Sequence, residues 1–199
     1  MPSVRRLWFD NRHLLGDTAG QLLLAELNAL DARAREDVLS AGDRLAAASL
    51  TLAQVFCRHA PAAWRAFGKQ GFFRWVRIGE LLVSEEPVSR DGAAAYFTVD
   101  PRVFAQLGLD VAEEWVAIGR ETLQKSRRLG VQFLQTSAPL LSLVPGPLIP
   151  RLRAWARHGS TLLGQQGWKG EFLAVAYFDA ARVALPVLSP DEMSHWAQL

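Results

Sequence analysis

The stretch Asp110–Pro139, DVAEEWVAIGRETLQKSRRLGVQFLQTSAP, decides the fold of this chain. Its Trp-x-x-x-Gly core occurs at Trp75 and Gly79, at Trp115 and Gly119, and at Trp155 and Gly159, so the tryptophans follow one another at intervals of 40 residues. A degenerate earlier copy pairs Val38 with Gly42. Self-similarity at such a period is typical of stacked helical units. The sequence therefore predicts an all-α fold, a right-handed solenoid of about four two-helix repeats of about 40 residues.

The first helix of each repeat carries the tryptophan and the glycine. The residues three, seven and eight positions after the tryptophan are mostly apolar and the fourth is the glycine, as on a half-buried helix. A glycine inside a helix costs about 1 kcal/mol relative to alanine, so its recurrence indicates that a neighbouring side chain approaches closely there. Helix starts are expected at Asp110, with Glu113 completing a capping box, and at Ser189, with Glu192 in the same role.

The second helix of each repeat is predicted to carry a pair of large apolar side chains. It is expected to run to Pro61, Pro101 and Pro139 in the first three copies. A short helical turn ending at Gly68 or Gly108 follows the first two of these prolines. The assigned pairs are Val55-Phe56, Tyr96-Phe97, Phe133-Leu134 and Phe172-Leu173.

The chain is expected to form one domain. Residues 1–30 are interpreted as an N-terminal arm and a capping helix, and residues 31–199 as the helical-repeat array. Phe172, Tyr177, Val183 and Leu188 are candidates for the outer side of the last helices. We therefore expect a partly apolar C-terminal face that pairs with a second copy, a partner or a further domain.

Composition indicates a globular protein of mildly basic charge. Half of the residues are hydrophobic, a fifth are charged, and the net charge is +2. The single cysteine, Cys57, excludes an intramolecular disulfide and fits a reducing compartment. No apolar run is long enough to cross a membrane, and the first residues lack a signal-peptide core, so a cytoplasmic location is expected.

No residue is predicted to be catalytic, to bind a cofactor or to ligate a metal. The sequence contains no phosphate-binding loop, nucleophile elbow or His-Glu-x-x-His motif. His158 occupies the apolar position filled by Ile78 and Ile118 in the other copies, which favours a hydrogen-bonded core histidine. The alternative is a ligand-binding or catalytic histidine in a cavity beside Trp155.

Basic side chains are the candidates for partner binding. Lys125, Arg127 and Arg128 on one helix, and Arg151, Arg153 and Arg157 on another, would form a stripe along one edge. A solvated face is the favoured interpretation of these side chains, and a phosphate-binding groove is the alternative. Trp168 lies off the tryptophan register and is a further candidate surface residue. The predicted partner-binding residues are Arg127, Arg128, Arg153, Arg157 and Trp168.

The pattern Trp-x-x-x-Gly…Ser…Phe-x-x-x-x-(x)-Pro resembles the helical repeats of bacterial proteins that also carry a von Willebrand A domain and work with MoxR-type ATPases. That group includes the Rubisco-activase adaptor and the nitric-oxide-reductase activation proteins. The resemblance covers roughly residues 38–199 and implies protein recognition within a remodelling assembly. The Asp-x-Ser-x-Ser motif of the A domain is absent here, so no metal-site residue is carried over.

The sequence thus predicts a non-enzymatic scaffold that binds another protein, an ATPase complex or its client being the partner that the resemblance implies. Pairing with a second copy is a further expectation. One alternative is an enzyme or small-ligand-binding protein with a cavity between helices. A nucleic-acid-binding helical repeat is a weaker alternative, because the arginines are scattered along the chain. A membrane partner is not expected.

Overall fold

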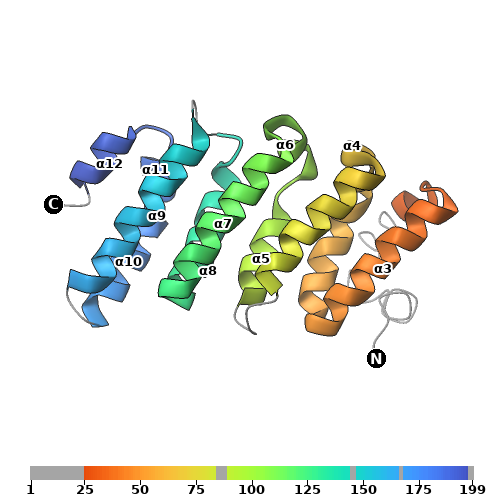
Figure 1. Ribbon diagram of the computed structural model, residues 1–199, viewed down its shortest axis with the longest axis horizontal. Coiled ribbons are helices and arrows are strands. Elements are labelled where there is room, and N and C mark those ends of the chain that lie inside the picture. Colours follow the sequence, from red (N-terminus) through yellow and green to blue (C-terminus); the bar gives the residue numbers. More distant parts are fainter. Residues whose placement is uncertain (1–24, 84–88, 144–146, 166–167, 197–199) are drawn as a thin grey trace. The chain divides into compact units, whose positions relative to one another are not determined.

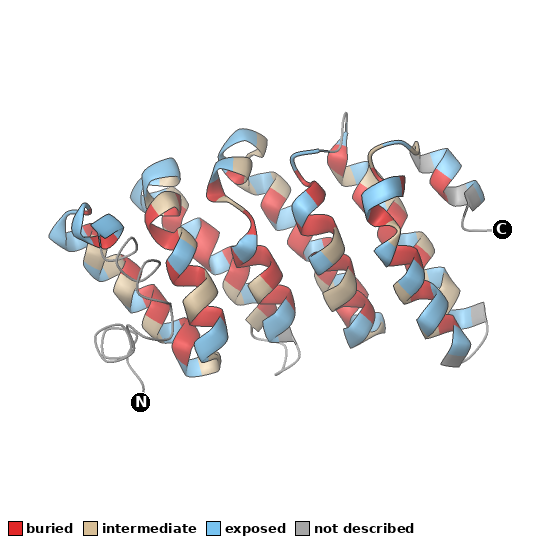
Figure 2. Ribbon diagram, turned by 180° about the vertical axis from the view of Figure 1, so that it is seen from behind, coloured by how far each residue is buried: buried red, intermediate tan, exposed pale blue. Residues whose placement is uncertain are grey.

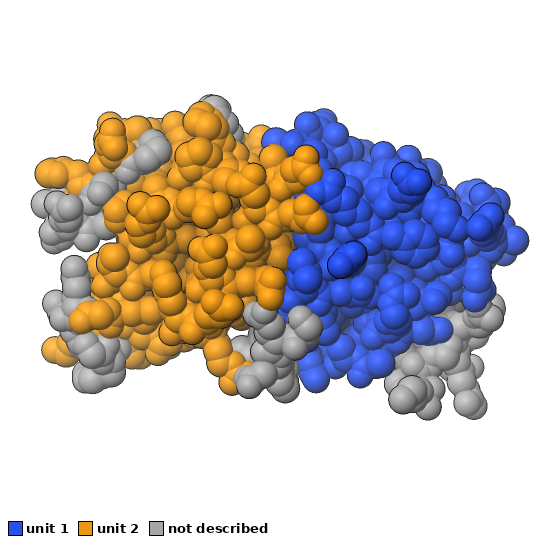
Figure 3. All heavy atoms as spheres, viewed as in Figure 1, with its two compact units in different colours: residues 1–109 blue, residues 110–199 orange. Residues whose placement is uncertain are grey.

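The computed structural model describes residues 25–83, 89–143, 147–165 and 168–196, and within these ranges every regular element is a helix (Figure 1). The predicted all-α class is therefore confirmed. The chain divides into two compact units, residues 1–109 and 110–199 (Figure 3). The predicted N-terminal arm and the start of the capping helix lie outside the described residues, and residues 25–28 of the predicted capping helix are helical.

Unit 1 is a series of packed helices. Asp31 caps the first of them, because its side chain accepts a hydrogen bond of 2.7 Å from the Ala34 backbone N–H. The second helix packs against the first and the third. The elements are α3 (Ala32–Ala48), α4 (Leu50–Val83), α5 (Ser89–Thr98) and α6 (Pro101–Leu107).

Helix α4 consists of two helices that meet at Gly68, where φ is 62° and ψ is −175°. The expected helix end at Pro61 is wrong, since Pro61 lies inside the first of the two. The corresponding Pro101 does start a new helix, because Asp100 accepts a hydrogen bond from the Arg102 backbone N–H and so caps it. Ala60, which precedes Pro61, has no side chain that can cap a helix.

Unit 2 contains the two remaining Trp-x-x-x-Gly helices. Helix α10 packs against both α8 and α9, and α12 packs against α9. The predicted capping box is confirmed at Ser189, whose backbone N–H donates to Glu192 at 2.7 Å while its hydroxyl accepts from the Glu192 N–H at 3.3 Å. The elements are α7 (Leu109–Lys125), α8 (Arg127–Ser137), η2 (Ala138–Leu140), α9 (Leu148–Gln165), α10 (Trp168–Asp179), α11 (Ala181–Ala184) and α12 (Pro190–Trp196).

The three tryptophans of the repeat are fully buried, as the apolar pattern predicts. Buried residues gather on the sides of the helices that face one another (Figure 2). The Tyr96 hydroxyl donates to the Trp75 carbonyl oxygen at 3.0 Å, and the Trp115 indole N–H donates to the Ser137 hydroxyl at 2.9 Å. Trp155 instead stacks on a tyrosine ring, described below. These tryptophans are core residues, which excludes them as a surface ladder for stacking ligands.

The repeated glycines lie beneath a large side chain of the following helix. A Cβ atom added at Gly79 would lie 2.2 Å from the ring of Phe97, and one added at Gly119 would lie 2.5 Å from Leu134. At Gly159 the neighbour is Phe178, at 2.4 Å. The expected close approach is confirmed at all three glycines.

The last repeat differs from its prediction. Phe178, rather than Phe172 or Leu173, covers the glycine of α9, and Tyr177 stacks on Trp155 with ring centroids 3.9 Å apart. The pair that corresponds in position to Tyr96-Phe97 is therefore Tyr177-Phe178. The assignment of Phe172-Leu173 was wrong by five residues, because an apolar pair at about the right spacing precedes the correct one.

Candidate binding sites on unit 2

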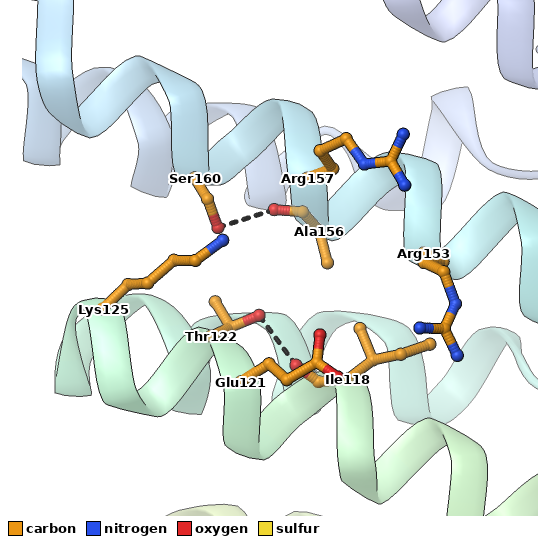
Figure 4. A pocket seen from close by; sticks show the side chains of 8 residues that line it. All are labelled: Ile118, Glu121, Thr122, Lys125, Arg153, Ala156, Arg157 and Ser160. Atoms are coloured by element: carbon orange, nitrogen blue, oxygen red, sulfur yellow. Dashed lines mark hydrogen bonds between the residues drawn. The ribbon is translucent and has the colours of Figure 1, made fainter.

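Two surface features of unit 2 have the composition of binding sites. The first is a hollow of about 110 Å³ between α7 and α9 (Figure 4), which we call the basic hollow. Its lining combines cations, a carboxylate, two hydroxyls and apolar atoms. The residues that line it are Ile118, Glu121, Thr122, Lys125, Arg153, Ala156, Arg157 and Ser160.

The deepest lining residues of the basic hollow are buried. Ile118, Thr122 and Ala156 are 1%, 2% and 5% exposed. The Thr122 hydroxyl donates to the Ile118 carbonyl at 2.9 Å, and the Ser160 hydroxyl donates to the Ala156 carbonyl at 2.8 Å. Because both hydroxyl protons are used within their own helices, the hydroxyl oxygens face the hollow as acceptors.

The charged side chains around the basic hollow are only partly neutralised. Arg153 forms an ion pair with Glu114 at 3.7 Å, close to the upper limit for such a contact. Among the described residues, Lys125, Arg157 and Glu121 take part in no ion pair. Figure 4 shows the Lys125 side chain reaching from α7 toward Ser160 on α9.

The predicted basic stripe is brought together only in part. Arg153 and Arg157 share the basic hollow with Lys125, but Arg128 lies over the ring of Phe172 at 5.3 Å. Arg127 is exposed in the first turn of α8. Arg151 instead donates to the Leu185 carbonyl at 3.1 Å. Trp168 begins α10, but its side chain lies outside the described residues.

His158 is half-buried rather than fully enclosed as Ile78 and Ile118 are. Burial lowers the pKa of its imidazole, and the neighbouring charge of Arg157 lowers that pKa further. Within the described part of the chain its ring makes no hydrogen bond, so the expected hydrogen-bonded core histidine is wrong. No group of three or more metal-ligating side chains gathers around it or elsewhere among these residues.

The second feature is an apolar surface on α10 and α11. Phe172, Leu173, Val183 and Val187 are 56%, 45%, 76% and 70% exposed. Together with the exposed Ala176 they form what we call the α10–α11 face.

The α10–α11 face lies along one side of a nearly continuous helical segment. Backbone hydrogen bonds join Ala180 to Ala176, Ala184 to Ala180 and Leu188 to Ala184 across the boundary between the two helices. Between Phe172 and Leu188 the charged residues are Asp179 and Arg182. A helix that is apolar on every side is normally buried on every side, and this segment is not.

Two of the four residues expected on an outer apolar side belong to this face. Phe172 and Val183 are exposed as expected, whereas Tyr177 is buried and Leu188 is partly buried. The burial of Tyr177 could have been predicted from the sequence, because Ala-Tyr-Phe occurs at residues 95–97 and again at 176–178, close to two repeat lengths apart.

No protein-family model matches the chain, and neither the curated proteins nor the solved structures include a match. Among the helices that the structure describes, none combines the length and the apolar composition needed to cross a membrane.

Proposed function

We propose that this chain is a non-enzymatic helical scaffold that binds another protein through the α10–α11 face. The observation that carries the proposal is the exposure of four large apolar side chains on a segment with only two charged residues. Contiguous apolar surface on a folded protein marks a site of association. The corresponding helix α8 exposes Arg127, Arg128 and Gln135 instead, so an apolar outer side is not a general property of these helices.

The spacing of the α10–α11 face favours a helix as the bound element. Leu173, Ala176, Ala180, Val183 and Val187 alternate at intervals of three and four residues, which is the spacing that accepts a second helix along a seam. The small Ala176 and Ala180 leave room at the centre for a partner side chain. The partner is therefore a protein that presents an amphipathic helix with an apolar stripe of its own.

The Arg128–Phe172 pair supports the same function. Arginine and large aromatic residues are the side chains that most often dominate the binding energy of protein interfaces. Here the guanidinium lies over the exposed ring, so both are held in one orientation before a partner arrives. A preorganised pair loses less conformational entropy on binding than two free side chains would.

The finer architecture belongs to the same proposal. The recurrence of one glycine contact at Gly79, Gly119 and Gly159 supports successive repeats of a right-handed helical solenoid. The resemblance of the Trp-x-x-x-Gly pattern to the helical arms of A-domain proteins makes a MoxR-type ATPase complex, or its client, the first partner to test.

The test compares two new carboxylates on the α10–α11 face with one new carboxylate elsewhere on unit 2. Val183→Asp/Val187→Asp alters the α10–α11 face, and Leu143→Asp alters another exposed apolar residue of unit 2, 63% exposed. Substitutions at such exposed sites change stability by about 0.5 kcal/mol or less, so both variants are expected to fold. Binding of a purified MoxR-type ATPase from the same genome is then measured by calorimetry.

We expect the double variant to bind at least about tenfold more weakly than the original chain, and Leu143→Asp to bind equally well. Equal weakening by both variants would rule out the α10–α11 face as the binding surface. Sedimentation of the chain alone gives the remaining outcome: if Val183→Asp/Val187→Asp converts a dimer to a monomer, the occupant of the face is a second copy, and the proposed heterologous partner is wrong.

A further inference from the structure

We propose that the basic hollow between α7 and α9 binds an oxyanion carrying two negative charges, of the phosphate or sulfate type. The hollow is formed by α7 and α9, whereas the α10–α11 face is formed by α10 and α11. Binding of an oxyanion in the basic hollow therefore does not depend on the partner proposed for the α10–α11 face.

Cations from two helices, α7 and α9, converge on the basic hollow. Arg153 and Arg157 are four residues apart on α9, so they lie on one face of that helix. Lys125 comes from the last turn of α7, where the helix dipole favours a cation. The dipole explains the position of Lys125 on α7, but it does not explain why Arg157 of α9 lines the same hollow. Like charges repel one another, and a bound anion removes that repulsion.

The hydrogen-bonding groups fit an oxyanion. Arg153, Arg157 and Lys125 can only donate, and guanidinium groups present paired N–H donors that match phosphate and sulfate oxygens. The oxygens of Thr122 and Ser160 act as acceptors, since their protons are used by their own helices. They suit the Lys125 ammonium or a protonated oxygen of the ligand.

Glu121 sets the charge that the ligand must carry. Three cations and one carboxylate line the hollow, and Glu114, outside the lining, pairs with Arg153 at 3.7 Å, so Lys125 and Arg157 are the two lining cations that form no ion pair among the described residues. A dianion can pair with both of these cations, whereas a carboxylate-type monoanion can pair with one of them and is repelled by Glu121 as well. The buried floor of Ile118 and Ala156 lowers the local dielectric constant and so strengthens both effects. The hollow therefore favours phosphate and sulfate over acetate.

The experiment titrates the full chain with inorganic phosphate, sulfate or acetate at constant ionic strength, with chloride as the balancing ion. Backbone amide resonances of α7 and α9 report the site. Saturable shifts of these resonances are expected for phosphate and sulfate, and binding of acetate at least about tenfold weaker. A phosphoserine peptide in a second series distinguishes a phosphorylated protein from a small phosphate ester as the source of the group.

Single substitutions of exposed residues identify which charged side chains contribute to phosphate binding. Lys125→Gln and Arg157→Gln are each expected to weaken phosphate binding about fivefold, and Glu121→Gln is expected to strengthen it about twofold. The matched control is Arg182→Gln, which removes the same charge from α11 and is expected to leave the affinity unchanged. Linear shifts without saturation, or equal weakening by Arg182→Gln, would mean that phosphate acts only as a diffuse counterion and would overturn the proposal.

Discussion

Gly119→Ala tests the packing that organises each helix pair. The added methyl group would lie 2.5 Å from Leu134 Cδ2 and 2.8 Å from its Cγ. Leu134 is fully buried, so it has little room to move away. Overpacking of a core costs about 1–3 kcal/mol, while replacing a helical glycine by alanine stabilises the helix by about 1 kcal/mol. We expect a net loss of about 1 kcal/mol in the free energy of unfolding.

Gly164→Ala is the matched control, because both variants replace a helical glycine by alanine and so gain the same helix stabilisation. Gly164 also lies in a helix, α9, but no atom lies within 4 Å of an added Cβ. This variant is expected to gain up to about 1 kcal/mol. Both variants are measured by urea unfolding followed by circular dichroism, and the difference between them, about 1–3 kcal/mol, isolates the cost of the clash.

A double mutant assigns that cost to one neighbour. Leu134→Ala alone is expected to destabilise by about 2–5 kcal/mol. In the Gly119→Ala background the same change should cost about 1–3 kcal/mol less, because the clashing methyl groups are gone. Additive effects, or a Gly119→Ala variant as stable as Gly164→Ala, would show that close approach of Leu134 is not the reason for the glycine.

Further expected outcomes concern the core and two titrating groups. Trp115→Ala should destabilise by about 3–5 kcal/mol in urea unfolding. Ser137→Ala, which leaves the Trp115 N–H without its buried acceptor, should cost about 1–3 kcal/mol. Burial, with a smaller contribution from a nearby carboxylate, raises the pKa of the Cys57 thiol from its ordinary 9.0 to about 12, so this thiol stabilises the fold fully below pH 9. That contribution should be lost as the pH rises from 9 toward 12, and unfolding of Cys57→Ala should show a smaller loss over the same range. The pKa of His158 should be found by NMR below its ordinary 6.5, and Arg157→Gln should raise it, since the Arg157 charge is one cause of the lowering.

Much of the local structure was predictable because it depends on neighbours along the chain. The capping box follows from the local spacing of Ser189 and Glu192, and the buried stripe around Trp115 follows from helical periodicity. The break at Gly68 was also visible, since glycine readily adopts a positive φ at the end of a helix. The prediction failed at Pro61 because the helix continues through this proline, whereas at Pro101 the Asp100 side chain caps a new helix.

The candidate sites were less predictable, because they depend on which residues meet in space. Lys125 and Arg157 are 32 residues apart in the chain, and only tertiary packing brings them to one hollow. The packing of α10 against α8 likewise places Arg128 over the ring of Phe172. Nothing in the local sequence distinguishes these two outcomes for a basic side chain.

By itself the sequence determined the helical class and the burial of the tryptophans, since both follow from the 3.6-residue periodicity of a single helix. The 40-residue period follows from the recurrence of the Trp-x-x-x-Gly pattern along the chain. Only the tertiary structure decided which apolar pair of the last repeat faces inward. Phe172-Leu173 and Tyr177-Phe178 are both apolar pairs on one helix, but only Phe178 lies over the bare backbone of Gly159 while Tyr177 stacks on Trp155. Packing of that kind depends on shape across two helices, and shape across two helices is not encoded in the pattern of either one.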